Sequence, residues 1–241
     1  MGRRILLLIS LLTMTAYTLT AIWLGINNAT TITIIECLPL LFSPARFVYC
    51  FSFFLFASLF IFIWQTHKNR QSIFALSSKQ TTLFIGTCFL QSLFFYEWHN
   101  EHLIIATISF VVSLISLFGL YITYPLNKES IQFRIPISLW LGWSLFFTLV
   151  IVSYMIMYYE WKGFGLSNGL WAVIMLSLGT AIALHLRYHH FDRVTPGIFI
   201  WCYVGIAITN GFDELFVTTA ALFLCGVLAT GIIFIRKKST V

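Results

Sequence analysis

Residues 134–159 read RIPISLWLGWSLFFTLVIVSYMIMYY, an arginine followed by more than twenty residues without charge. An apolar run of this length can cross a bilayer core of roughly 30 Å as a helix, at about 1.5 Å per residue. Pro136 lies where the first turn of that helix would be, and there its missing N–H costs little. The stretch therefore predicts a transmembrane helix that begins close to Pro136.

One side of this helix is aromatic. Trp140, Trp143 and Phe147 follow one another at spacings of three and four residues, which places them on a common face. Gly142 and Ser144 lie beside them and would let a neighbouring helix approach closely. We expect this face to pack against other helices of a bundle. Trp140 lies near the end of the span, so the alternative for it is anchoring at the membrane–water interface.

The composition indicates an integral membrane protein. Of the 241 residues, 59% are hydrophobic and 9% charged, and the mean hydropathy is +0.91. A soluble domain is about a quarter charged. The net charge of +6 does not point to nucleic acid, because the basic residues are dispersed between apolar runs. The five cysteines show neither pairing nor metal-ligand spacing, so we expect them to behave as small hydrophobic side chains.

The apolar runs predict an all-α, polytopic transmembrane helical bundle of about eight spans. The first run is too long for the core of a signal peptide, so we read it as a retained span. The seventh is short, and a re-entrant segment there would leave seven spans. The predicted spans are residues 5–26, 47–64, 81–98, 103–124, 137–159, 170–186, 197–210 and 215–235.

Lysine and arginine set the orientation of these spans. With the N-terminus inside, twelve of them fall in inner segments and two, Arg46 and Lys162, in outer ones. Basic residues near span ends concentrate on the cytoplasmic side of membrane proteins. We therefore expect a multi-pass protein of the cell membrane with both termini in the cytoplasm.

The middle of the predicted membrane region carries no charge. Proton relays and ion-coupled carriers place ionisable groups at that depth, so neither class is favoured, and we expect no enzyme activity. His99 and His102 lack a third ligand at fixed spacing, so we expect a solvated turn, with Trp98 at the interface, rather than a metal site. No cofactor is expected.

Arg46 opposes the charge bias, since it begins a span on the outer side. We expect it to pair with an acidic residue of the same side, namely Glu36, Glu97 or Glu160. The alternative is that its guanidinium receives the acidic group of a ligand, because its planar fork suits carboxylates.

Two motifs resemble the tryptophan-rich sensory proteins, relatives of the translocator protein or peripheral benzodiazepine receptor family. Residues 42–49, FSPARFVY, resemble the family's FTPAGYVF, and residues 136–143, PISLWLGW, resemble its PFSIYLGW. Further positions follow in the order expected of longer members: Trp161, Gly163, Trp171, Arg187, Asp192, Trp201, Gly205 and Ile206. The similarity covers residues 42–206.

The resemblance implies one membrane domain over residues 1–241, with a five-helix core in residues 1–160 and three appended helices in 161–241. It also implies a cavity towards the outer loop that receives a flat lipophile such as a tetrapyrrole or a sterol. The residues expected to contact that ligand are Trp143 as the floor, with Phe147, Trp140, Trp98, Arg46 and Phe47.

Two functions are consistent with these features. The first is a membrane sensor or accessory carrier that binds a small flat hydrophobic ligand. The alternative is a non-catalytic interaction subunit of a transporter or signalling complex, favoured because Ser52 and Ile151 stand where relatives carry Trp and Asn. Expected partners are the bilayer, a hydrophobic ligand and either a second copy or another membrane protein; nucleic acid is not expected.

Labelling of single cysteines tests the orientation. In a cysteine-free background, a cysteine at Lys162 should react with an impermeant thiol reagent added to intact cells, and one at Lys128 should not. Labelling at Lys128 without labelling at Lys162 would show the opposite orientation.

Overall fold

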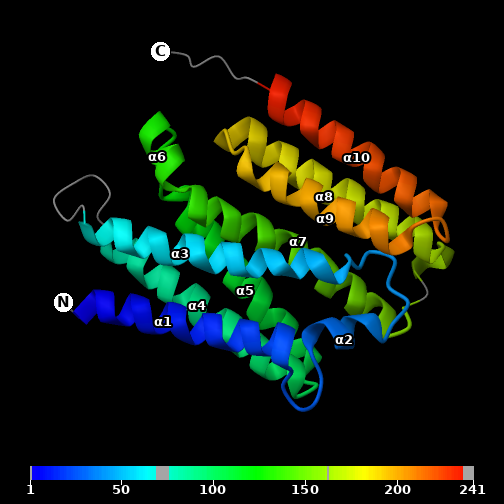
Figure 1. Ribbon diagram of the computed structural model, residues 1–241, viewed down its shortest axis with the longest axis horizontal. Helices are drawn as coiled ribbons and strands as arrows, with labels where there is room; N and C mark the ends of the chain where they lie inside the picture. The colour runs from blue at the N-terminus through cyan, green and yellow to red at the C-terminus, as the bar shows by residue number, and fades with distance from the viewer. Residues whose placement is uncertain (1, 69–75, 162, 236–241) are drawn as a thin grey trace. The chain divides into compact units, whose positions relative to one another are not determined.

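The described part of the chain is predominantly helical. The computed structural model describes residues 2–68, 76–161 and 163–235, and contains no β-strand among them (Figure 1). Of the basic residues used for the orientation, Arg70, Lys162, Arg236, Lys237 and Lys238 lie outside the described residues. The predicted all-α polytopic bundle is confirmed.

The helices group into two compact units. The first comprises Met1–Ile34 and Phe51–Leu141, and the second Ile35–Cys50 and Gly142–Val241. The division falls inside the longest helix, α7 (Ile135–Tyr158), whose first residues belong to unit 1 and the rest to unit 2. The predicted grouping into a five-helix core and three appended helices stays a prediction.

Unit 1 is built around α4, which packs along α1 on one side and α5 on the other (Figure 1). A capping box starts α4: the Ser77 hydroxyl accepts from the Gln80 N–H (3.2 Å), and the Gln80 side chain accepts from the Ser77 N–H (2.9 Å). The elements are α1 (Gly2–Leu19), the π-helical turn η1 (Thr20–Leu24), α2 (Thr31–Glu36), which continues into unit 2, α3 (Phe51–Lys68), α4 (Ser78–His99), α5 (Leu103–Ile122) and α6 (Lys128–Phe133).

His99 at the end of α4 is internal to unit 1. Its Nδ1 lies 3.2 Å from the Ile26 carbonyl and its Nε2 lies 3.1 Å from the Thr31 hydroxyl, so the ring joins α4 to the segment that follows α1. His99 is 5% exposed and Trp98 1%. The expectation of a solvated turn with Trp98 at the interface is wrong for these two residues, because both are buried and His99 bonds to the segment after α1.

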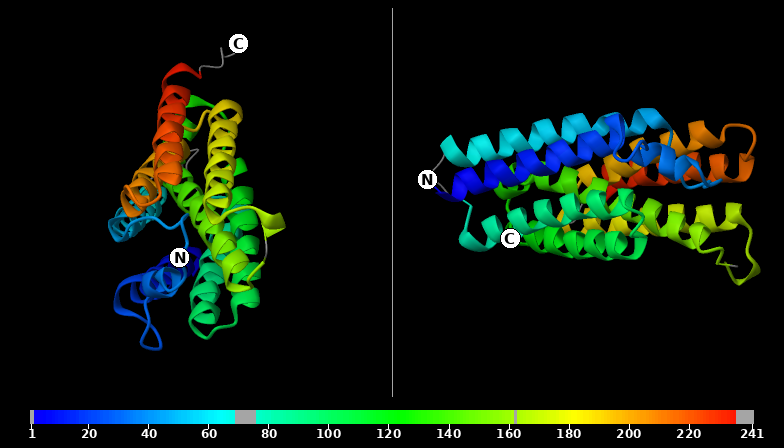
Figure 2. Two further views of the ribbon diagram at one scale, coloured as in Figure 1. Left: turned by 90° about the vertical axis from the view of Figure 1, so that its right-hand side faces the viewer. Right: turned by 90° about the horizontal axis from the view of Figure 1, so that it is seen from below.

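Unit 2 contains three mutually packed helices, α8, α9 and α10 (Figure 2). Gly179 lets α8 and α9 approach, since a Cβ there would overlap the ring of Phe199 and the Tyr203 hydroxyl. The elements of this unit are η2 (Arg46–Cys50), most of α7, the short turn η3 (Gly163–Gly165), α8 (Asn168–His190), α9 (Val194–Asn210) and α10 (Leu215–Phe234).

Six helical segments of the described chain are long and apolar enough to span a membrane, so the predicted count of eight, or of seven, is not reached. They are Gly2–Leu24, Arg46–Thr66, Leu103–Ile122, Ile135–Tyr158, Asn168–His190 and Leu215–Phe234. The other two predicted spans are helices too. However, α4 opens with the polar run SKQTT, and α9 has 17 residues, about 25 Å of helix.

Among these six, α7 is the most enclosed. In its most apolar window 72% of the residues are buried, against 22–44% in the other five. Arg134, immediately before α7, is also buried, and its guanidinium carbon lies 4.3 Å from the centre of the Tyr121 ring. This is cation–π geometry, and it gives the charge a partner at the start of the helix.

Asp192 caps the start of α9. Its Oδ1 accepts from the backbone N–H groups of Val194 (2.8 Å) and Thr195 (3.3 Å), and its Oδ2 accepts from the Thr195 hydroxyl (3.1 Å). The residue is 2% exposed. One buried carboxylate thus satisfies two N–H groups at the beginning of the helix, where no intrahelical acceptor exists.

Replacing Asp192 by alanine should destabilise the protein by about 1–2 kcal/mol, as the loss of a helix cap does. For a chain of this size we expect a fall in Tm of about 2–4 °C for each kcal/mol, measured in detergent. The exposed Asp213, replaced in the same way, is the matched control. Equal Tm values for the two variants would contradict a capping role.

Candidate functional site

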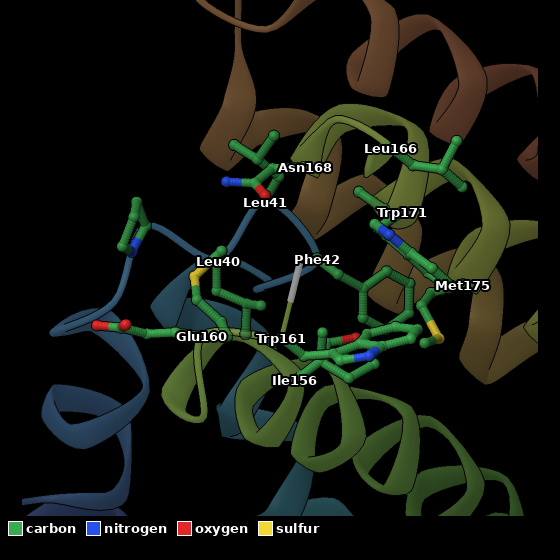
Figure 3. Close-up of a pocket in the computed structure, with 14 residues that line it drawn as sticks. Leu40, Leu41, Phe42, Ile156, Glu160, Trp161, Leu166, Asn168, Trp171 and Met175 are labelled. Carbon is green, nitrogen blue, oxygen red and sulfur yellow. The ribbon is translucent and has the colours of Figure 1, made fainter. Parts of the chain in front are cut away.

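A pocket of about 330 Å³ opens in unit 2, at the end of α7 and the start of α8 (Figure 3). Its walls come from the segment before η2, the last turns of α7, the connection after α7 and the first turns of α8. The lining residues are Pro39, Leu40, Leu41, Phe42, Ser153, Ile156, Met157, Glu160, Trp161, Leu166, Asn168, Trp171, Ala172 and Met175.

One wall, residues 39–42, is irregular backbone fixed by α9. The Asn210 side chain donates to the Leu41 carbonyl (2.9 Å), and the Ala45 N–H donates to the Gly205 carbonyl (3.2 Å). A Cβ at Gly205 would overlap the Val48 side chain, so glycine is what permits the close approach. Asn210 and Gly205 of α9 thus hold this segment through bonds to its backbone, in addition to the turn bonds that the segment makes itself.

The second wall follows from the way α7 ends. The Trp161 N–H donates to the Ile156 carbonyl (3.1 Å) and the Glu160 N–H to the Met157 carbonyl (3.0 Å), the paired bonds of a Schellman motif. Glu160 occupies the left-handed position of that motif with φ of 49°. Glycine is usual there because it has no Cβ, so this chain places a carboxylate at an unfavourable backbone position.

The third wall is one face of α8. The Ser167 hydroxyl accepts from the Leu170 N–H (3.3 Å) and caps the helix. With the start fixed, residues 168, 171, 172 and 175 recur at helical spacing and share a side, as the labelled Asn168, Trp171 and Met175 in Figure 3 illustrate. This spacing, with Trp171 among the four residues, could have been recognised in the sequence as one side of a binding site.

Aromatic rings cluster at this pocket. The Trp161 and Trp171 rings lie 5.2 Å apart at 54°, and Trp161 also meets Phe164 edge-on at 5.0 Å. Phe42 is 1% exposed and packs on Phe146 at 5.7 Å. An apolar cavity with a few polar groups is the usual form of a small-molecule site.

The polar groups of the lining are few. Ser153 donates to the Leu149 carbonyl (2.8 Å), and Asn168 lies in the first turn of α8. Of the fourteen described lining residues, Glu160 alone carries a charge. Among the described residues no group of three or more His, Cys, Asp or Glu is arranged to hold a metal ion.

Arg46 forms an ion pair with Glu36, as expected from the acidic residues assigned to its side of the membrane. Its Nε lies 2.8 and 3.2 Å from the two carboxylate oxygens, and both side chains are partly exposed. The hydrogen bond from Arg46 holds the pKa of Glu36 below its ordinary value. The prediction that Arg46 is paired is confirmed.

Trp143, Phe147 and Phe47 of the predicted ligand contacts lie in unit 2. Trp143 is 7% exposed and meets Tyr49 edge-on at 6.2 Å, and Phe147 is buried. Phe47 is 37% exposed and meets Trp201 edge-on at 5.3 Å. All three, like Arg46, stand outside the lining of the pocket at α8.

Trp140 and Trp98 lie in unit 1. The Trp140 indole N–H donates to the Gln91 side chain (3.0 Å), and its ring meets Phe84 edge-on at 5.2 Å. Interfacial anchoring of Trp140 is therefore wrong, since its polar atom is satisfied internally. Trp98 packs on Phe94 at 5.4 Å. Ligand contact by any of the six predicted residues stays a prediction.

The fold and its apolar helices define a multi-pass α-helical membrane protein with a small aromatic pocket. The chain belongs to the TSPO-like protein family, whose model matches residues 4–234. The resemblance found in the two sequence motifs is thereby confirmed and extended over nearly the whole chain. No curated protein and no solved structure matches the chain significantly.

The Arg46–Glu36 pair should lose its coupling in acid. The pKa of Glu36 is lowered in the folded protein, so the ion pair stabilises the fold fully at pH values above the ordinary carboxyl pKa. This stabilisation is lost as the pH falls through the lowered pKa of Glu36. A double-mutant cycle with Glu36→Gln and Arg46→Met, followed by Tm, should show coupling at pH 7 that shrinks towards pH 3. Coupling that grows on acidification would contradict the pairing.

Proposed function

We propose that the protein binds a small hydrophobic ligand in the pocket between α7 and α8, as a sensor or accessory carrier of the cell membrane. The supporting observation is the pocket itself, which has Phe42, Trp161 and Trp171 in its walls. Stacking on such rings contributes about 0.5–1.5 kcal/mol beyond the area buried.

The size of the cavity favours a compact or chain-like ligand. At about 330 Å³ it stands at the lower end of the range of roughly 300–1,000 Å³ that small-molecule sites occupy. A tetrapyrrole or a sterol exceeds this volume and would extend beyond the residues that line the pocket. A single-ring or two-ring molecule would fit within it.

Binding rather than catalysis is proposed for this pocket. Glu160 is the one titratable side chain among the described lining residues, and acid–base or nucleophilic chemistry usually requires a second group within hydrogen-bond reach. A ligand that touches residues 39–42 also touches the segment that α9 holds through Asn210. That contact offers a physical route for sensing.

We propose further that α4 and α9 cross the membrane with the six apolar helices. In unit 1, α4 packs along α1 and α5 and is about 33 Å long; in unit 2, α9 packs along α8 and α10. Eight crossings preserve the twelve-to-two distribution of basic residues and support cytoplasmic termini. The pocket then opens towards the outer side.

Trp171→Ala should weaken binding at least about fivefold, because the variant removes a ring that lines the pocket. We would screen porphyrins, sterols, retinoids and smaller aromatic compounds against the protein in nanodiscs and follow quenching of tryptophan fluorescence.

Trp143→Ala is the matched control for that experiment. It also removes one tryptophan, but from a packed position outside the pocket lining, so quenching by the bound ligand should persist. If Trp143→Ala abolishes binding while Trp171→Ala leaves it intact, the ligand occupies the site anticipated from the sequence motifs and not this pocket.

A further inference from the structure

The charge distribution around the pocket is one-sided. Glu160 is the single charged side chain among its described lining residues, and Figure 3 shows the carboxylate at one end, with Phe42, Trp171 and Met175 gathered towards the other. We propose that the ligand is a hydrophobic monocation whose positive group lies at Glu160 and whose apolar body lies against the aromatic residues. This inference rests on the proposed function of the same pocket.

The end of α7 reinforces a preference for positive charge. A helix C-terminus carries about half a negative elementary charge, and Glu160 follows the last turn of α7 directly. The start of α8 at Asn168 contributes a partial positive charge of similar size at another edge of the pocket. The two helix ends roughly offset each other, so among the described lining residues the charge of Glu160 decides the sign.

The Glu160 side chain is exposed, and it takes part in neither of the two ion pairs found among the described residues, Arg46 with Glu36 and His102 with Glu97. Trp161, the next residue, is 44% exposed, and its ring lies 5.2 Å from that of Trp171. The carboxylate therefore suits the ammonium group of a ligand, and the rings suit its apolar body.

The backbone at Glu160 allows a clean test of the side chain. Its φ of 49° suits glycine better than glutamate, so Glu160→Gly removes the carboxylate without disturbing the Schellman motif. Glu101 has a φ of 66°, is also exposed, and lies in unit 1. It is therefore a matched control with the same residue type and the same backbone region.

The experiment uses three probes with one apolar body: 4-phenylbutylamine, 4-phenylbutanol and 4-phenylbutanoate. Their Kd values would be measured at pH 7 by calorimetry on the full-length protein in nanodiscs, with empty discs subtracted. We expect the amine to bind the unmodified protein about fivefold tighter than the alcohol, as for a partly exposed ion pair at the upper end of its usual strength. The carboxylate should bind most weakly.

Glu160→Gln and Glu160→Gly should each reduce the affinity for the amine to that for the alcohol and leave the alcohol unchanged. The corresponding changes at Glu101 should alter neither. Equal binding of amine and alcohol by the unmodified protein, or an amine affinity that survives both Glu160 variants, overturns the inference but leaves the proposed function standing. Failure of all three probes to bind below about 1 mM also overturns it.

A positive group could come from a free amphiphile or from a lipid headgroup. Repeating the measurements in phosphatidylcholine and phosphatidylglycerol discs separates these sources, because bound choline headgroups would compete with the amine. For each lipid we would divide the amine affinity of the unmodified protein by that of Glu160→Gln. Competition by choline headgroups makes this ratio smaller in phosphatidylcholine discs than in phosphatidylglycerol discs, whereas for a free amphiphile the ratio is the same in both. Partitioning of the amine into the discs cancels in that ratio.

Discussion

The anchoring of residues 39–45 on α9 is the constraint on which the pocket depends. The segment satisfies some of its own backbone groups, since the Leu40 N–H donates to the Leu38 carbonyl and the Ser43 N–H to the Leu40 carbonyl, but other groups need partners from outside it. Here Asn210 donates to the Leu41 carbonyl, and the Gly205 carbonyl accepts from the Ala45 N–H. Because α9 supplies these partners, an irregular segment can serve as a wall beside the packed helices.

The need to satisfy backbone hydrogen bonds also explains what the sequence could predict. Each predicted span contains or overlaps a helix, because an uncharged run of that length leaves few alternatives in a membrane. The start of α7 near Pro136 and the pairing of Arg46 followed from local chemistry and from charge. The number of spans could not be predicted in this way. The composition of α4, which starts with SKQTT, and the length of α9, 17 residues, are both marginal for a spanning helix.

Which face of a helix looks inward was harder to predict. Lipid is as apolar as the interior of a bundle, so a tryptophan suits either side. Trp140 and Trp98 are both buried, and only the bond from Trp140 to Gln91 identifies the interior for the first of them. Gln91 lies 49 residues earlier in the chain, and no periodicity relates the two.

The pocket shows why a site escapes sequence reasoning when its parts serve other purposes. Glu160 counted only as one acidic residue in an external turn, yet it stands at a left-handed position that costs a non-glycine residue of order 1–3 kcal/mol. Glu101 stands at such a position too, in the tight turn between α4 and α5, so the conformation by itself does not identify a ligand site. What separates the two is their surroundings: Glu160 borders a cavity with Trp161 and Trp171, and this setting gives its carboxylate a candidate role.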